Sequence, residues 1–92
     1  MSYKIKFITD DEEINTQNFE FDGSNSIEYI LINFIMKTHF KFNLDANDFL
    51  FVYNNVFLLN KEKNLKKTVS DIFKNKRENI YIKVSNFQKV IG

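Results

Sequence analysis

The alternation of apolar and polar positions at the start of the chain predicts a β-hairpin. Residues 3–8 alternate with period two, which is typical of a half-buried strand. Residues 19–21 predict a second strand that closes at Asp22. The polar stretch 10–13 between them predicts a turn, so the two strands are expected to pair antiparallel.

The stretch that follows predicts one long amphipathic helix. Its apolar residues recur at spacings of three and four, at Ile27, Ile30, Leu31, Phe34 and Ile35. Ile32 and Met36 are expected to widen this buried stripe. Asn25 or Ser26 is the predicted N-cap, and the helix is expected to end near His39.

The second half of the chain predicts three further strands, at residues 48–53, 56–58 and 80–84. Asn54 and Asn55 favour positive φ and therefore a tight turn between the first two of these strands. Residues 60–67 predict a solvated loop. Residues 68–73 have the spacing of a capping box and predict a short helical turn.

This order of elements predicts an α+β fold with one long helix across one face of a mixed sheet. The first and last strands are strongly patterned, and a crossover through the helix separates them, so we expect them to pair parallel near the centre. The result is the β-grasp, or ubiquitin-like, architecture. A split βαβ sandwich would need a second full helix, for which residues 68–73 are too few. We expect a domain over 1–85 and a tail over 86–92.

Composition limits the function classes. The 92 residues are 43% hydrophobic, enough for one small core. With no cysteine and a single histidine, His39, we expect no disulfide, no metal site, no cofactor and no enzymatic activity. The acidic residues 10–13 lack the spacing of a calcium loop and are interpreted as a solvated turn. A net charge of +1 argues against nucleic-acid binding.

Charge and hydropathy also bear on location. No apolar run reaches 18 residues, and the N-terminal residues lack a signal-peptide pattern, so we expect a cytoplasmic protein without direct membrane insertion. Basic residues concentrate between Lys61 and Arg77. A solvated face is the favoured interpretation of this run; an acidic partner or anionic lipid is the alternative.

The outer sheet face is the predicted partner surface. Lys4 and Lys6 on the first strand, and Tyr81 and Lys83 on the last, are expected to lie opposite the core. The strand at 48–53 is apolar on both faces, so whichever set points inward leaves apolar side chains outside. The predicted partner-binding residues are Lys4, Lys6, Phe51, Tyr53, Tyr81 and Lys83.

Gly92 is the candidate for covalent chemistry. The chain contains only two glycines, and one is its last residue. On a ubiquitin-like scaffold that carboxylate would be adenylated, passed to a cysteine as a thioester and transferred to an amine. Glycine leaves the carbonyl unobstructed for these attacks.

From about Ile27 to Gly92, and most densely from Leu50 onward, the sequence resembles the autophagy-related ubiquitin-like modifiers, most closely those of the autophagy-twelve type. The segments that carry the likeness are Leu50–Asn55, Val69–Phe73, Ile80–Val84 and the final Gly92. The autophagy-eight type shares the Asn-Asn turn but adds two helices before the first strand.

The resemblance implies a conjugate in which activating and conjugating enzymes join Gly92 to a lysine of autophagy protein five. That conjugate would promote lipidation of the autophagy-eight modifier, and its partners would recruit it to forming autophagosomal membranes. The family usually has an aromatic residue before the final glycine, where this chain has Ile91. A noncovalent complex with the same partner, or a β-grasp binding module that is never conjugated, therefore remains an alternative.

Overall fold

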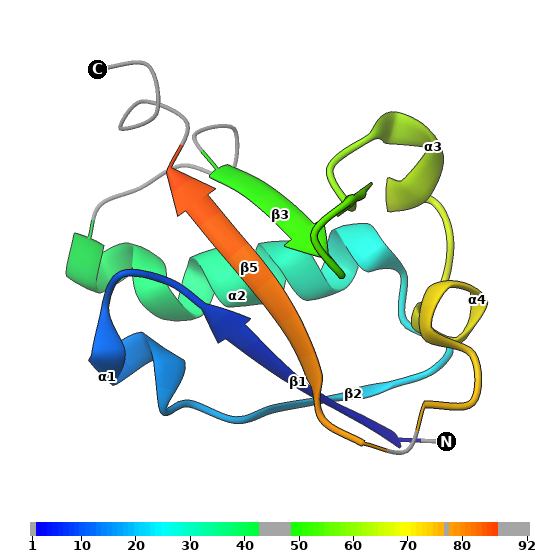
Figure 1. The fold of residues 1–92 in the computed structure, drawn as a ribbon, viewed down its shortest axis with the longest axis horizontal. Coiled ribbons are helices and arrows are strands. Elements are labelled where there is room, and N and C mark those ends of the chain that lie inside the picture. Colours follow the sequence, from blue (N-terminus) through cyan, green and yellow to red (C-terminus); the bar gives the residue numbers. More distant parts are fainter. Residues whose placement is uncertain (1, 43–48, 77, 87–92) are drawn as a thin grey trace.

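A computed structural model of the chain describes residues 2–42, 49–76 and 78–86 (Figure 1). The side chains of residues 39–42, 49 and 86 are outside this description. In chain order the elements are β1 (Ser2–Ile8), α1 (Glu12–Asn15), β2 (Phe19–Asp22), α2 (Ile27–Phe42), β3 (Phe49–Tyr53), β4 (Phe57–Leu58), α3 (Glu62–Leu65), α4 (Val69–Phe73) and β5 (Ile80–Asn86).

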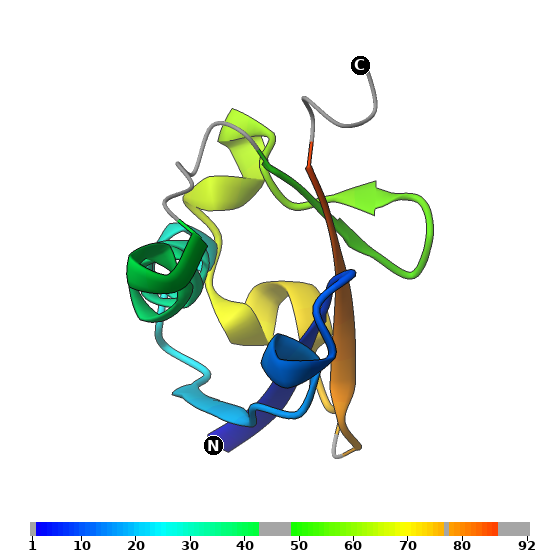
Figure 2. The same ribbon diagram turned by 90° about the vertical axis from the view of Figure 1, so that its left-hand side faces the viewer.

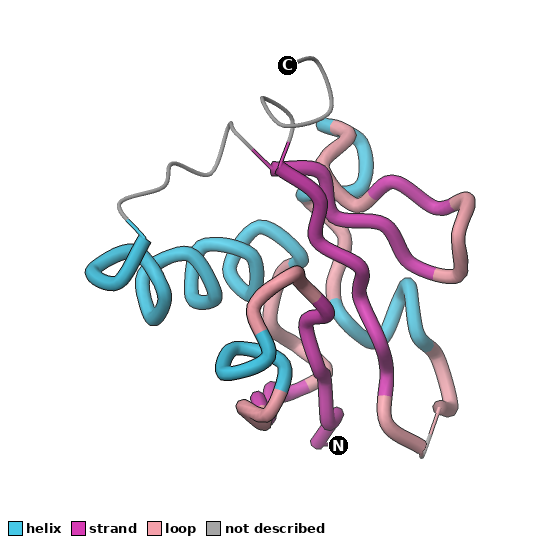
Figure 3. Tube along the Cα trace, turned by 60° about the vertical axis from the view of Figure 1, so that its left-hand side comes forward, coloured by secondary structure: helices cyan, strands magenta, loops and turns pink. Residues whose placement is uncertain are grey.

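The described strands form one five-stranded sheet in the order β2-β1-β5-β3-β4. The first and last strands pair parallel, with Ile5 opposite Ile80 and Phe7 opposite Ile82, as the sequence predicts. The pairs β1–β2, β3–β5 and β3–β4 are antiparallel. β5 therefore lies at the centre of the sheet, between β1 and β3 (Figure 3).

One face of the sheet is covered and the other is open. Figure 2 shows the four described helices on the same side of β5. The predicted helix stripe packs against this inner face, and all five of its residues are buried: Ile27, Ile30, Leu31, Phe34 and Ile35. α2 extends three residues beyond the predicted end at His39.

Ile32 and Met36 do not widen the buried stripe, contrary to the expectation. Their exposed fractions are 46% and 64%, and Tyr29 on the same helix is 49% exposed. The physical reason is the helical period, because positions 29, 32 and 36 project away from the side that contacts the sheet. These three residues form a second apolar surface, which we call the helix-back surface.

Four phenylalanines make the centre of the core. The Phe7 and Phe34 rings stack with centroids 4.3 Å apart, while Phe19 contacts Phe7 edge-on at 5.1 Å. Phe51 contacts both Phe7 and Phe34 edge-on, at 6.2 and 5.8 Å. Edge-to-face and offset-stacked rings are the favoured aromatic arrangements, and each pair adds about 0.5–1.5 kcal/mol beyond burial.

Side-chain caps determine where the helices begin. Ser26 is the N-cap of α2, because its hydroxyl accepts a hydrogen bond from the Tyr29 N–H at 3.0 Å. The Asn25 amide oxygen instead accepts from the Asp22 N–H at 3.0 Å, so of the two predicted caps only Ser26 serves. The residues 10–13, predicted as a turn, contain the start of α1, which Asp11 caps.

The predicted Asn-Asn turn is confirmed, and it leads into a segment that the sequence misassigns. Asn54 and Asn55 have φ values of 56° and 67°. The segment predicted as a solvated loop contains α3, which buries Asn64 at 3% exposure. The Asn64 Nδ2 donates to the Leu58 carbonyl at 2.8 Å, and the Asn60 Oδ1 accepts from the Phe51 N–H at 2.7 Å.

The capping box of α4 predicts an acid-sensitive part of the stability. Hydrogen bonds from Thr68, first from its backbone N–H and then from its side chain, hold the pKa of Asp71 below its ordinary value of 3.8, and Lys67 adds to the effect. The pKa is lower in the folded state, so this contribution is present above about pH 3.8 and is lost as the pH falls through the folded value. We expect Asp71→Asn to destabilise the protein at pH 7 but to match it at pH 2, by urea unfolding. The control is Glu78→Gln, and equal destabilisation at both pH values would refute the assignment.

Candidate functional site

The strand register defines which side chains share the open face of the sheet. Lys6 lies opposite Tyr81, and Lys83 lies between Ile8 on β1 and Val52 on β3. Leu50 lies opposite Ser85 on the same side. We use the term outer face for the side chains of Lys4, Lys6, Ile8, Leu50, Val52, Tyr81, Lys83 and Ser85.

Four of the predicted site residues lie together on the outer face. Tyr81 is 54% exposed, Lys4 and Lys83 are exposed, and Lys6 is partly exposed. β1 and β5 position them, because the inward alternation of Ile5, Phe7, Ile80 and Ile82 forces the intervening residues outward. The arrangement is an exposed aromatic ring among lysines.

Phe51 does not belong to this surface, and its assignment as a partner-binding residue is wrong. Its exposed fraction is 1%, because β3 turns it inward opposite Val84 and against the α2 rings. The apolar side chains that β3 leaves on the outer face are those of Leu50 and Val52, both partly exposed.

Tyr53 lies on the same side of β3 as Phe51 but at the end of the strand, where the core is shallow. Its ring contacts Phe73 edge-on at 4.9 Å, and the Lys76 ammonium lies 5.8 Å from the ring centroid. Tyr53 is partly exposed and contributes to a pocket at the margin of the outer face.

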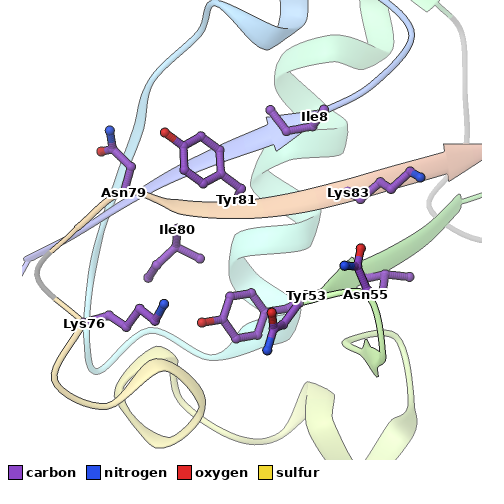
Figure 4. A pocket seen from close by; sticks show the side chains of 10 residues that line it. Ile8, Tyr53, Asn55, Lys76, Asn79, Ile80, Tyr81 and Lys83 are labelled. Carbon is purple, nitrogen blue, oxygen red and sulfur yellow. The ribbon is translucent and has the colours of Figure 1, made fainter.

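That pocket has a volume of about 320 Å³ and lies beside the N-terminal part of β5 (Figure 4). Its lining consists of Ile8, Val52, Tyr53, Asn54, Asn55, Lys76, Asn79, Ile80, Tyr81 and Lys83. The size is at the lower end of that of ligand pockets in proteins. Sequence reasoning missed the contribution of Lys76 and the three asparagines, because it needs the turns at 54–55 and 74–79 to be folded against one sheet edge.

The described residues show few features of other kinds of site. No three His, Cys, Asp or Glu side chains in residues 2–42, 49–76 and 78–86 come together as a metal-binding group. Within the same ranges no helix is long and apolar enough to cross a bilayer. The predicted conjugation residue, Gly92, and the tail from residue 87 onward lie outside the described residues. β5 continues to Asn86, one residue past the predicted domain boundary.

Comparison with known proteins identifies the fold. No protein-family profile matches the chain, and no curated protein sequence matches it. Among solved structures, the chain is similar to the ubiquitin-like domain of an Arabidopsis thaliana protein, whose structure was determined by solution NMR, with a TM-score of 0.57. The match covers 94% of this chain and 78% of the Arabidopsis chain at 11% sequence identity. The chain therefore has the ubiquitin-like, β-grasp fold, and the predicted fold class is confirmed.

Proposed function

We propose that this chain is a ubiquitin-like module that binds protein partners through its outer face and has no catalytic activity of its own. The observation that carries the proposal is Tyr81, 54% exposed at the centre of the sheet, with Lys6 opposite it and Lys83 two residues further along β5. Exposed aromatic side chains are enriched at protein interfaces, where they supply much of the binding energy.

The finer proposal is a modifier of the autophagy-twelve type. The sequence resemblance supports it, and a ubiquitin-like fold is what such a modifier requires. On this proposal the carboxylate of Gly92 is joined to a lysine of autophagy protein five. The complex promotes lipidation of the autophagy-eight modifier, and its partners recruit it from the cytoplasm to forming autophagosomal membranes.

The covalent route consists of three transfers, all performed by partner enzymes. ATP adenylates the carboxylate of Gly92 and releases pyrophosphate. A cysteine thiolate of the activating enzyme displaces AMP to form a thioester, which passes by exchange to the conjugating enzyme. The lysine amine of the acceptor then attacks the thioester carbonyl, and the isopeptide bond forms as the thiol leaves.

Deleting Gly92 tests the covalent proposal. With the activating enzyme, the conjugating enzyme, ATP and autophagy protein five present, the full chain should give a thioester that reducing agent cleaves, and a conjugate that resists it. The deletion variant should give neither, while its urea unfolding midpoint stays unchanged, because a chain terminus contributes little to a packed core. Intact mass and gel mobility are the measurements.

The second candidate function is a noncovalent partner complex, which Ile91 favours because the family usually has an aromatic residue there. The same experiment separates the two. Tight binding to autophagy protein five by both forms of the chain, with no covalent species from either, would contradict conjugation and support the noncovalent module.

A further inference from the structure

Two features that are separate in the sequence meet at the pocket beside β5. One is the basic run from Lys61 to Arg77, which contributes Lys76; the other is the outer face, which contributes Lys83. The α4 helix brings them together, because it ends at Phe73 and its last turn is followed by a positive φ of 52° at Lys74. The hydroxyl of Tyr3 donates to the Lys74 carbonyl and ties this turn to the core.

The pocket exists because β5 is longer than the strand beside it. The last residue pair between β3 and β5 is Tyr53 with Ile82. Ile80 and Tyr81 continue past the end of β3, where the chain turns away through Asn54 and Asn55. On that side of β5 no described strand pairs with residues 80–81, and the pocket occupies this position.

The lining combines an apolar floor with a cationic rim. Ile8, Val52 and Ile80 are apolar, while Lys76 and Lys83 lie at different ends of the pocket in Figure 4. The stacking of Lys76 against the Tyr53 ring keeps its ammonium at the rim.

No carboxylate offsets these charges among the ten lining residues. Three asparagine amides, which can both donate and accept hydrogen bonds, complete the polar part of the rim: those of Asn54, Asn55 and Asn79.

We propose that this pocket binds an acidic segment of a protein partner, with carboxylates at Lys76 and Lys83 and an aliphatic side chain on the apolar floor between them. The charge complementarity of the lining defines this class of ligand, since a cationic rim favours an anionic segment and repels a basic one. The inference rests on the proposed function and adds the chemistry of the partner to it.

The test is an NMR titration of the full ¹⁵N-labelled chain with designed peptides. The probe peptide has glutamate, leucine and glutamate alternating with serines, so that in an extended conformation these three side chains share one face. The matched peptide replaces both glutamates by glutamine. We expect saturable amide shifts at Asn54, Asn55, Asn79 and Tyr81 with the glutamate peptide, and at least about tenfold weaker binding of the glutamine peptide.

Two variants with the same change in net charge separate the pocket from general charge attraction. Lys76→Gln combined with Lys83→Gln should weaken binding at least about tenfold, whereas Lys61→Gln combined with Lys63→Gln should change it less than about twofold. Equal binding of the two peptides, equal loss in the two variants, or no saturable shifts at the lining residues would overturn the inference.

Such a failure is distinguishable from failure of the proposed function. If the peptides fail while autophagy protein five still binds the wild-type chain and loses affinity on Tyr81→Ala, the outer face is the partner surface and only the acidic-segment inference falls.

Discussion

Replacing Phe51 by alanine is expected to lower the free energy of unfolding by about 3–5 kcal/mol. The side chain is 1% exposed and contacts the rings of Phe7 and Phe34, so its removal leaves a cavity at the point where the sheet meets α2. Folded domains are stable by only about 5–15 kcal/mol, so this one substitution removes a large share of the total. Equilibrium urea unfolding measures the loss.

Val56→Ala is the matched control for this prediction. Val56 is 85% exposed in the β3–β4 turn, and its truncation should change stability by no more than about 0.5 kcal/mol. A Phe51→Ala variant that keeps wild-type stability but loses partner binding would place Phe51 on the outer face and contradict the register of β3.

Replacing Tyr81 by alanine should have the opposite profile. Its ring is half exposed, so stability should change by less than about 0.5 kcal/mol. Truncation of an interface aromatic at a hot spot costs about 2 kcal/mol or more, which corresponds to a roughly 30-fold weaker Kd for autophagy protein five. Isothermal titration calorimetry with the purified partner measures it.

Tyr29→Ala is the control, because it removes the same type of side chain at nearly the same exposure, 49%, from the helix-back surface. Its affinity for the partner should stay within about twofold of wild type. Loss of binding in Tyr29→Ala with none in Tyr81→Ala would assign the partner to the helix instead of the sheet.

The architecture could be predicted because each strand and helix carries its own periodicity. The alternation at 3–8 and 80–84, and the helical stripe from Ile27 to Ile35, each correspond to one buried face in the structure. The parallel pairing of β1 with β5 then follows from the crossover through α2.

The inward face of β3 could not be predicted from β3 alone. Its residues are apolar on both sides, so alternation leaves two possibilities. The structure decides through β5, where Ile82 and Val84 are buried and lie opposite Tyr53 and Phe51. Partner-strand register therefore carries the information that the sequence pattern of β3 lacks.

The short helices and the pocket were missed for a different reason. A single turn is too short to show helical periodicity, so α1 and α3 were interpreted from their polarity as turn and loop. Asn60 and Asn64 are polar residues whose amides bond to backbone groups of β3 and β4, a role that composition does not reveal. The pocket depends on the tertiary approach of Lys76 to β5, and local patterns contain no information about that approach.

Chemical-shift mapping of the partner contact tests the central claim most directly. The ¹⁵N-labelled chain is titrated with autophagy protein five, and the amide signals that shift or broaden are placed on the structure. The account predicts that the affected amides cluster at Lys6, Val52, Tyr81 and Lys83, on adjacent strands β1, β5 and β3. A cluster confined to α2 around Ile32, with the amides of these three strands unaffected, would contradict it.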